Sequence, residues 1–540
     1  MAGEQSDLLK YVRRYKNMGK NGYFSLCMRP SKGKIVSVAV CLAIALAAAV
    51  FFLLAYPNHF FHREHYTLFL ASGEFIRQMF AQGVYQPRQW MPTLAGEYLT
   101  QFYYYVGGGP AIVGVVLLLL GLVAMALARR LGAGWLCASS VAAVVMLWEA
   151  GRQCVGAYPL SSSLSLLMGG GLALLYPSRC GMAWRRYVAA VVICGVGLTS
   201  LGYGGAVPIA YIIVTEGVRR RWVMAIVGVV ALAFVPYGGF RGGCWVGFPN
   251  MTSEAILRVD VKSCWGRALT EDDYPASIRN TQIANSLYTL SQIRQKGDAA
   301  LDDVNWANTQ LFIPVNEKGS YLGFTAAGEV WYSIGDMTMA EHSTILGMIF
   351  SPAHAASRHV KRLAEIALVR GDDAAAAKYL RILSHTATHG AWAAARSASA
   401  IPLRIAELRT LMPQSDTLRA SADYGRSLRN LLNNNANNTL ARTYLLALDL
   451  QQKRMRNFVE DYLRYGKGIM TRTYAEALMV MAATAPDEIK ARLEGVALPP
   501  DVWRDFVRFN ELMERGDVAT LRREFAGSYW LFFQKISDSK

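Results

Sequence analysis

The feature that most constrains this chain is the way positive charge alternates along a series of apolar stretches. Residues 1–237 hold seven apolar stretches and carry 20 Lys and Arg against 7 Asp and Glu, whereas residues 238–540 carry 36 against 32. The net charge of +17 therefore belongs mainly to the apolar half. A nucleic-acid-binding protein would concentrate such charge on a soluble domain, so the distribution argues against nucleic acid as a partner.

The Lys and Arg of the first half fall on alternate connections between the apolar stretches. Eight precede the first stretch, and eight more lie near residues 130, 180 and 220. Because positively charged loops stay in the cytoplasm, the N-terminus is predicted to be cytoplasmic. The loop of residues 57–109 and everything after residue 237 are then predicted to lie outside. The basic segment of residues 1–34 is interpreted as a solvated retention signal beside anionic lipid.

The apolar stretches predict a polytopic membrane bundle of about seven helices over residues 35–237. The first, Ile35–Tyr56, is 22 residues long, enough to cross a hydrocarbon core of roughly 30 Å, and no small-residue cleavage site follows it. Further predicted spans are Pro110–Ala128, Leu131–Glu149, Leu160–Tyr176 and Trp222–Tyr237. Residues 187–218 are short for two crossings, and either a hairpin of tilted helices or a re-entrant loop would return the chain to the cytoplasm.

After a junction over residues 238–276, residues 277–540 predict a soluble array of helical hairpins. A basic residue followed by Gly-Asp occurs at Gly297, Gly371 and Gly516. A basic residue suits a helix C-terminus, Gly takes the left-handed position after it, and Asp caps the next helix, so each triplet predicts a helix-to-helix turn. The run from Asn433 to Asn438 predicts another inter-helix loop with an N-cap.

The fold predicted from these patterns is all-α, a membrane helix bundle followed by a tetratricopeptide-like solenoid. Such hairpins stack so that a concave face binds peptides or proteins. The alternative, in which the solenoid only packs on its own membrane domain, stays open. The eight cysteines form no CxxC pair. Cys244 and Cys264 fall in the exported junction, where a disulfide closing about 20 residues and two free thiols are both open.

The first external loop holds the best candidate for chemistry. His62, Glu64 and His65 follow the first span, together with His59 and Arg63. Histidines with a carboxylate can bind a divalent metal ion, and Glu64 could act as a general base. A structural role is the stronger alternative, because His and aromatic side chains favour the bilayer interface. The aromatic residues that suggest the same interfacial belt are Trp90, Tyr98 and Tyr103–Tyr105.

Other acidic residues of the membrane half are weaker candidates. Glu74 and Glu97 lie in the same external loop. Glu149 and Glu216 lie at the ends of predicted spans, where we expect them to face a polar cavity or the interface.

Several strings of the sequence resemble a known family. They are Tyr56–Phe69, Leu99–Tyr105, Trp331–Gly335, Arg358–Leu383 and Asn438–Tyr462. Together they resemble an uncharacterised family of Bacteroidota multi-pass proteins, a domain-of-unknown-function family. The resemblance implies a Gram-negative inner-membrane protein with a periplasmic helical domain, and it supplies no functional residues. The basic segment of residues 1–34 is longer than the family pattern, and the stretch before Tyr474 lacks an expected proline.

The layout is also similar to that of GT-C membrane glycosyltransferases, which use lipid-linked sugars. What this layout implies is a base in the first external loop, Glu64, and a cation for the lipid phosphate, Arg63 or Arg77. The paired Asp/Glu signature usual after the first span of those enzymes is replaced here by Arg63-Glu64-His65. Likeness of layout alone does not carry function.

The sequence therefore predicts an inner-membrane-anchored periplasmic interaction protein in envelope assembly or secretion. Its expected partners are membrane lipids and envelope proteins. The alternative is a glycosyltransferase acting on a lipid-linked sugar. A transport role is disfavoured because the membrane half shows no internal repeat and few intramembrane charges.

Overall fold

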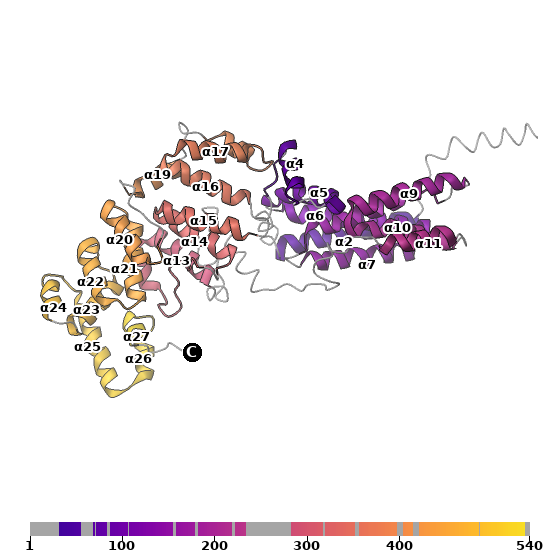
Figure 1. Ribbon diagram of the computed structural model, residues 1–540. Helices are drawn as coiled ribbons and strands as arrows, with labels where there is room; N and C mark the ends of the chain where they lie inside the picture. Colours follow the sequence, from indigo (N-terminus) through magenta and orange to yellow (C-terminus); the bar gives the residue numbers. More distant parts are fainter. Residues whose placement is uncertain are drawn as a thin grey trace, which may run out of the picture. The chain divides into compact units, whose positions relative to one another are not determined.

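The computed structural model describes most of the chain as helix (Figure 1). The described residues are 32–55, 68–70, 72–83, 87–105, 107–154, 158–178, 182–218, 222–233, 282–316, 319–351, 356–396, 403–413, 421–484 and 487–534. Within them there is no strand, so the all-α prediction is confirmed. They divide into two compact units, each of which is described by itself.

Unit 1 takes in Met1–Phe51, Pro87–Thr93 and Ala111–Gly247, as far as these ranges are described. A helix occupies each apolar stretch that the sequence marked. The helices are α2 (Lys32–Ala55), α6 (Gly108–Arg130), α7 (Trp135–Gln153), α8 (Leu160–Leu174), α9 (Ala183–Ser200), α10 (Ala206–Val218) and α11 (Trp222–Ala233). Among the described helices, α2 and α6 are long and apolar enough to cross a membrane, and α8 is apolar but shorter. The other crossings stay predictions.

Residues 187–218, for which the sequence left a hairpin of helices and a re-entrant loop open, form a helical hairpin. Helices α9 and α10 are joined by the 3-10 turn η5 (Gly202–Gly205). The glycines there permit close packing: a Cβ at Gly169 on α8 would lie 2.0 Å from the Gly204 carbonyl oxygen, and one at Gly205 would lie 2.4 Å from that of Gly197. Small residues let backbones approach in this way where helices pack in an apolar solvent.

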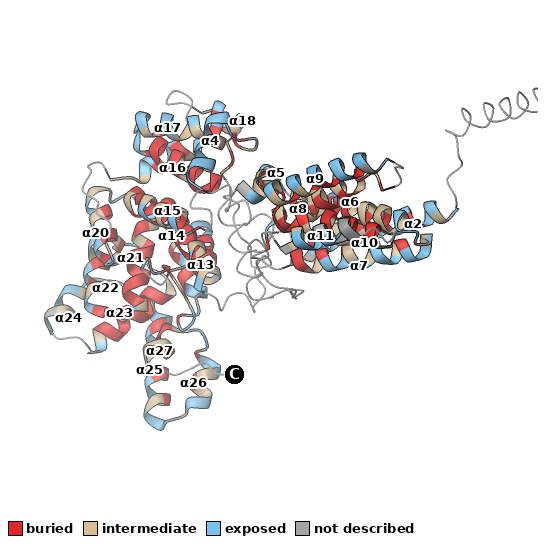
Figure 2. Cartoon of the chain, turned by 45° about the vertical axis from the view of Figure 1, so that its right-hand side comes forward, coloured by how far each residue is buried: buried red, intermediate tan, exposed pale blue. Residues whose placement is uncertain are grey.

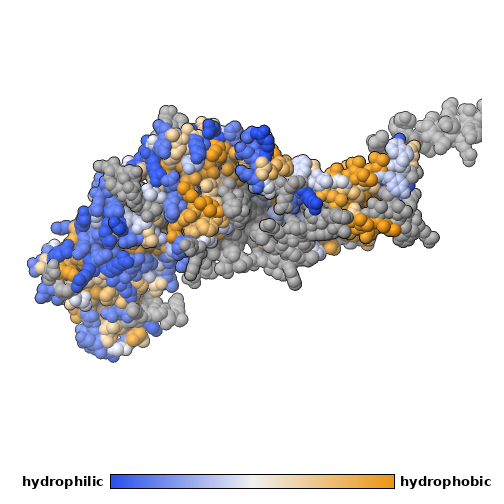
Figure 3. Space-filling view, viewed as in Figure 1, coloured by the Kyte–Doolittle hydropathy of each residue, from blue (hydrophilic) through white to orange (hydrophobic). Residues whose placement is uncertain are grey.

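Unit 1 carries its apolar side chains on the outside. Leu136, Leu175 and Val191 are 83%, 72% and 72% exposed. Figure 3 shows apolar residues gathered over the helices of this unit on the face in view. Exposed apolar side chains in such number mark a surface suited to contact with protein or lipid.

Unit 2 takes in Phe52–Gln86, Leu94–Pro110 and Phe248–Lys540, as far as these ranges are described. Its helices in the first half of the chain are α4 (Gly73–Ala81) and, from Leu94 on, α5 (Trp90–Thr100). Those of the second half are α13 (Gln282–Lys296), α14 (Tyr321–Ile334), α15 (Met337–Phe350), α16 (Ser357–Arg370), α17 (Asp373–Ser384), α18 (Gly390–Ala394), α19 (Leu403–Leu411), α20 (Tyr424–Asn434), α21 (Thr439–Gln451), α22 (Met455–Asp461), α23 (Arg472–Thr484), α24 (Asp487–Leu493), α25 (Pro500–Arg515), α26 (Val518–Glu524) and α27 (Tyr529–Phe533).

Successive helices of unit 2 pack as hairpins, in particular α14 with α15, α16 with α17, α20 with α21 and α25 with α26. Figure 2 shows the buried residues on the facing sides of these helices. The largest core cluster joins α13 to α23, and Trp331 of α14 lies near its centre, stacked on Phe312 at 4.7 Å between ring centroids. The predicted helical-hairpin domain is therefore present, and its relation to tetratricopeptide repeats stays a prediction.

The Gly-Asp turns at Gly371 and Gly516 are confirmed. Both glycines are left-handed, with φ of 74° and 67°. Asp372 and Asp517 then cap the next helices, because each Oδ1 accepts a hydrogen bond from the backbone N–H three residues on, at 2.9 and 3.0 Å. Gly335 makes a further turn of this kind, which the sequence reading missed because no basic residue precedes it.

The turn predicted at Gly297 was only half right. Gly297 is left-handed, with φ of 63°, but the 3-10 helix η8 (Gly297–Asp303) follows it instead of a second α-helix. The Asp298 side chain does not cap that helix. It is buried and accepts hydrogen bonds from Arg442 (2.7 Å), Thr443 (3.0 Å) and Tyr474 (2.7 Å). Charged and hydroxyl donors brought in by α21 and α23 satisfy the carboxylate better than one local N–H would.

The predicted N-cap in the asparagine run is Asn438. Its Oδ1 accepts from the Ala441 N–H at 2.9 Å. Its Nδ2 also donates to the carbonyls of Ile334 (2.7 Å) and Leu411 (2.9 Å), at the ends of α14 and α19. One buried amide therefore satisfies backbone groups of three helices, as buried backbone groups require.

Part of the predicted external loop packs on the helical-hairpin domain. Leu68 lies against the small cluster around α16 and α18. The Ala387 N–H donates to Gln101 Oε1 at 3.2 Å, and the Tyr104 ring lies 4.7 Å from the buried His389 ring. Tyr103 is buried and Tyr104 is half-buried, so both pack against protein, and the predicted belt of interfacial aromatics stays a prediction. Tyr98 and Tyr105 are exposed.

The contact at His389 predicts loss of stability in mild acid. Burial and the charge of Lys361 lower the pKa of His389 to about 3. In the unfolded chain this histidine is protonated below about pH 6.5, whereas in the folded chain it stays neutral. Its contribution therefore lowers the free energy of unfolding as pH falls below that value, by up to about 1.4 kcal/mol per pH unit. Thermal melts at pH 7.5 and 5.5 should show this contribution as a difference between wild type and His389→Gln, because the raised pKa of Asp336, about 6, adds a slope of opposite sign to both proteins. In His389→Gln the slope of the free energy of unfolding against pH should lack the contribution of one proton. In His385→Gln, which changes an exposed histidine, the slope should be unchanged. Equal slopes in all three proteins would contradict the prediction.

Candidate functional site

The residues predicted to form a metal or glycosyltransferase site lie outside the described part of the chain. These are His62, Arg63, Glu64 and His65, and the same holds for Cys244 and Cys264. Among the described residues, no group of three or more His, Cys, Asp or Glu side chains is placed to hold a metal ion. The metal, base and disulfide predictions therefore stay predictions.

Arg77, the other predicted cation for a lipid phosphate, is described and lies on the surface. On α4 it pairs with Glu74 at 2.8 Å, with side-chain exposures of 76% and 61%. An exposed pair of this kind contributes about 0–1 kcal/mol. Glu97 lies half-buried on α5. None of these three residues lines the two cavities described below.

Glu149 is buried in a polar cluster inside unit 1. Its Oε2 accepts from Tyr158 at 2.8 Å and from Ser163 at 2.7 Å, and Arg152 Nη1 lies 3.4 Å from Oε1. The Arg152 guanidinium also covers the Tyr158 ring at 4.0 Å. A carboxylate with this many partners is stabilised where it lies, so a role in holding α7 to α8 accounts for it.

Glu216 is buried in the same manner. Tyr176 donates to its Oε1 at 3.0 Å, and Arg186 Nη1 lies 3.8 Å from its Oε2. These contacts link α10 to α9 and to the end of α8. Neither acid faces one of the cavities described here, because buried carboxylates in an apolar bundle require charged or hydroxyl partners, and a position at the bilayer interface stays a prediction.

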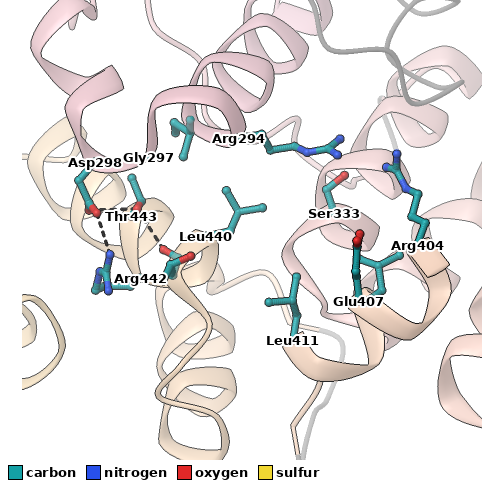
Figure 4. Close-up of a pocket in the computed structure, with 13 residues that line it drawn as sticks. Arg294, Gly297, Asp298, Ser333, Arg404, Glu407, Leu411, Leu440, Arg442 and Thr443 are labelled. Atoms are coloured by element: carbon teal, nitrogen blue, oxygen red, sulfur yellow. Dashed lines mark hydrogen bonds and ion pairs between the residues drawn. The ribbon is translucent and has the colours of Figure 1, made fainter.

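The most distinctive site of the described residues is a cavity of about 310 Å³ in unit 2 (Figure 4). It lies between α13, α14, η8, α19 and α21. The lining residues are Ile293, Arg294, Gly297, Asp298, Ser333, Arg404, Glu407, Leu408, Leu411, Thr439, Leu440, Arg442 and Thr443. Leu408 is buried in the main core, with Leu411 and Leu440 packed against that core, so a rigid scaffold carries the wall.

The three arginines of this cavity differ in how they are satisfied. Arg442 is paired with Asp298. Arg294 and Arg404 form no hydrogen bond or ion pair with another described residue, and Figure 4 shows their side chains reaching toward one another above Ser333. Partial burial and the nearby charge of Arg404 lower the pKa of Arg294, and the charges of Glu329 and, less strongly, Glu407 act in the opposite direction.

This arrangement can bind an anion. Two guanidinium groups face one carboxylate, Glu407, which leaves surplus positive charge in a partly enclosed space. A guanidinium presents a planar fork of N–H donors that matches a carboxylate or phosphate in a bidentate manner. No histidine or cysteine lines the cavity, and the carboxylate beside the Thr443 hydroxyl, Asp298, is already paired with Arg442, so the geometry favours binding over covalent chemistry.

The sequence reading missed this site. Arg294 ends one helix and Arg404 begins another more than a hundred residues later, with no local motif at either. Gly297 and Asp298 were interpreted as a turn, and the lining residues of α14 and α21 entered the sequence analysis as parts of the family resemblance, without a role in a site. An arginine at a helix C-terminus is ordinarily a solvated residue that complements the helix dipole, so nothing local marked Arg294.

The fold and the cavity define an all-helical protein in which an apolar helix bundle accompanies a helical-hairpin domain with an arginine-lined pocket. The model of a family of unknown function, DUF6057, matches residues 32–261 and 290–536, and the chain belongs to this family. The match covers both the bundle and the hairpin domain. No curated protein and no solved structure matches the chain.

Proposed function

We propose that this protein is anchored in a Gram-negative inner membrane by unit 1 and binds acidic segments of envelope proteins through the arginine-lined pocket of unit 2. The observation that carries the proposal is the pair Arg294 and Arg404, which point into one cavity without a protein partner. Arg294 is exposed and Arg404 is half-buried, and two neighbouring guanidinium groups without a protein carboxylate as partner favour an external anion.

The membrane placement is supported by the helices of unit 1. Two of them, α2 and α6, have the length and composition of membrane spans. Arg129 and Arg130 end α6, and the alternation of Lys and Arg between the stretches favours a cytoplasmic N-terminus. That topology places the hairpin domain in the periplasm, where its ligands would be envelope proteins.

A peptide segment fits the pocket better than a small metabolite would. The cavity of about 310 Å³ holds one or two side chains. Ile293, Leu411 and Leu440 line it beside the arginines, so it offers apolar contacts next to the anion-binding groups. A segment with Asp or Glu flanked by aliphatic residues matches this lining, and hairpin arrays present such surfaces to peptides.

The test is binding of defined peptides to the purified protein. Acidic peptides that carry Asp or Glu between aliphatic residues should bind wild type, and their Asn and Gln counterparts should not. The double variant Arg294→Glu/Arg404→Glu should lose roughly 100-fold or more in affinity, because attraction becomes repulsion at both contacts. Fluorescence anisotropy measures the change.

Two controls make the result specific. Arg426→Glu, an exposed reversal on α20, should leave affinity within about twofold, because single rim charges change affinity little. Peptides with Lys in place of the acid should bind the double variant better than wild type. Equal affinity of wild type and double variant for the acidic peptides would refute the pocket as the binding site.

The glycosyltransferase alternative stays a prediction, since no observation on the described residues favours it. It requires Glu64 as a base, with Arg63 or Arg77 on the lipid phosphate and a divalent metal ion as an open option. Glu64→Gln would abolish transfer of a lipid-linked sugar if this alternative held, and it should leave acidic-peptide binding unchanged under the proposal made here.

A further inference from the structure

We propose that a second cationic cavity, at the end of α6, binds the phosphate of an anionic phospholipid headgroup. This cavity of about 550 Å³ lies within unit 1 and is lined by Arg129, Arg130 and residues 174–178. The two arginines are the last residues of α6, one of the two helices with the length and composition of a span. The inference rests on the membrane placement proposed above, which puts this helix end at the level of the headgroups.

The two arginines are held in place but not neutralised. Arg130 Nη1 donates to the Leu174 carbonyl, and Arg129 Nη1 donates to the Ala133 carbonyl. The Arg129 guanidinium also covers the Trp135 ring at 4.3 Å. Neither forms an ion pair with a carboxylate of the described residues. Each contact uses one N–H of five, so both groups present further donors with their full charge.

The surroundings distinguish a lipid from free phosphate. Leu131 and Leu175 are 48% and 72% exposed. Leu131 directly follows Arg130 in the chain, and Leu175 is itself part of the lining. A headgroup phosphate would meet the guanidinium forks while its acyl chains covered these apolar residues, which is how basic pockets between membrane helices bind anionic lipid.

The test is lipid retention by the full-length protein, measured by native mass spectrometry after release from vesicles of mixed phosphatidylglycerol and phosphatidylcholine. Wild type should retain phosphatidylglycerol in preference to phosphatidylcholine. The double variant Arg129→Gln/Arg130→Gln should lose that preference by about tenfold or more. The control Arg88→Gln removes one exposed charge from a connection predicted to lie on the opposite side of the membrane and should keep the preference.

A second measurement on wild type alone protects the test against a misfolded variant. A photoactivatable phosphatidylglycerol should crosslink within residues 129–136 and 174–178, and excess phosphatidylglycerol should suppress the crosslink. Crosslinks elsewhere, or equal retention by wild type and double variant, would overturn the inference. Displacement by millimolar inorganic phosphate alone would make the site one for free phosphate and also overturn it. Absence of the protein from the membrane fraction would instead defeat the proposed function, and this inference with it.

Discussion

Asp298→Ala is expected to destabilise the helical-hairpin domain by about 3–5 kcal/mol, because it leaves a buried arginine without its partner. The Asp298 carboxylate is about nine-tenths buried and receives Arg442, Thr443 and Tyr474 at 2.7–3.0 Å. Burial and this carboxylate raise the pKa of Tyr474 well above its usual value, so the hydroxyl stays protonated and donates to Asp298. Loss of the Asp298 carboxylate therefore strands Arg442 and Tyr474, whereas Thr443 keeps the Thr439 carbonyl as an acceptor at 3.0 Å.

The loss of stability in Asp298→Ala should be measured at the helices around the substitution, because a chain with two units does not unfold in one step. Hydrogen exchange of the α21 and α23 backbone should accelerate by roughly 100-fold or more, the factor that corresponds to about 3 kcal/mol. The matched control is Asp303→Ala, at the other end of the same 3-10 helix. Asp303 pairs with Lys296 at 2.8 Å but is 67% exposed, so its removal should change stability by less than about 1 kcal/mol. Equal exchange in the two variants would show that Asp298 is not a structural hub.

Trp331→Ala is expected to be the most damaging core substitution, at about 3–5 kcal/mol. Trp331 is fully buried, stacks on Phe312 at 4.7 Å and meets the Tyr424 ring edge-on at 5.3 Å. Removing the indole leaves a cavity that α14, anchored on both sides, cannot close. The same helix carries Ser333 in the pocket wall, so acidic-peptide binding should weaken together with stability.

Thermal melts followed by near-ultraviolet circular dichroism check this prediction. Trp503→Ala removes the same side chain from α25, where it is 58% exposed, and should shift stability by less than about 0.5 kcal/mol. A melt of Trp331→Ala that matched the melt of Trp503→Ala would mean that the core around α14 repacks freely, against the packing described above.

The sequence by itself determined the all-α class, the position of the apolar helices and the Gly-Asp turns at 371 and 516. These follow from local rules: apolar run length, helical periodicity, and the left-handed position that only glycine adopts readily. The turn at Gly335 was also readable, since its Gly-Asp pair is present, and it was missed because the pattern demanded a basic residue.

Tertiary structure alone decided what the polar residues do. In the sequence Asp298 resembles a helix N-cap. In the structure it is a buried hydrogen-bond acceptor, because Arg442 and Tyr474, more than 140 residues away in the chain, donate to it. Glu149 likewise lies in a buried cluster, where it accepts hydrogen bonds from Tyr158 and Ser163. Arg294 and Arg404 face one another because of how α13 and α19 pack. Electrostatic interaction depends on the distance between two charges in space, and the separation of two residues along the chain does not determine that distance.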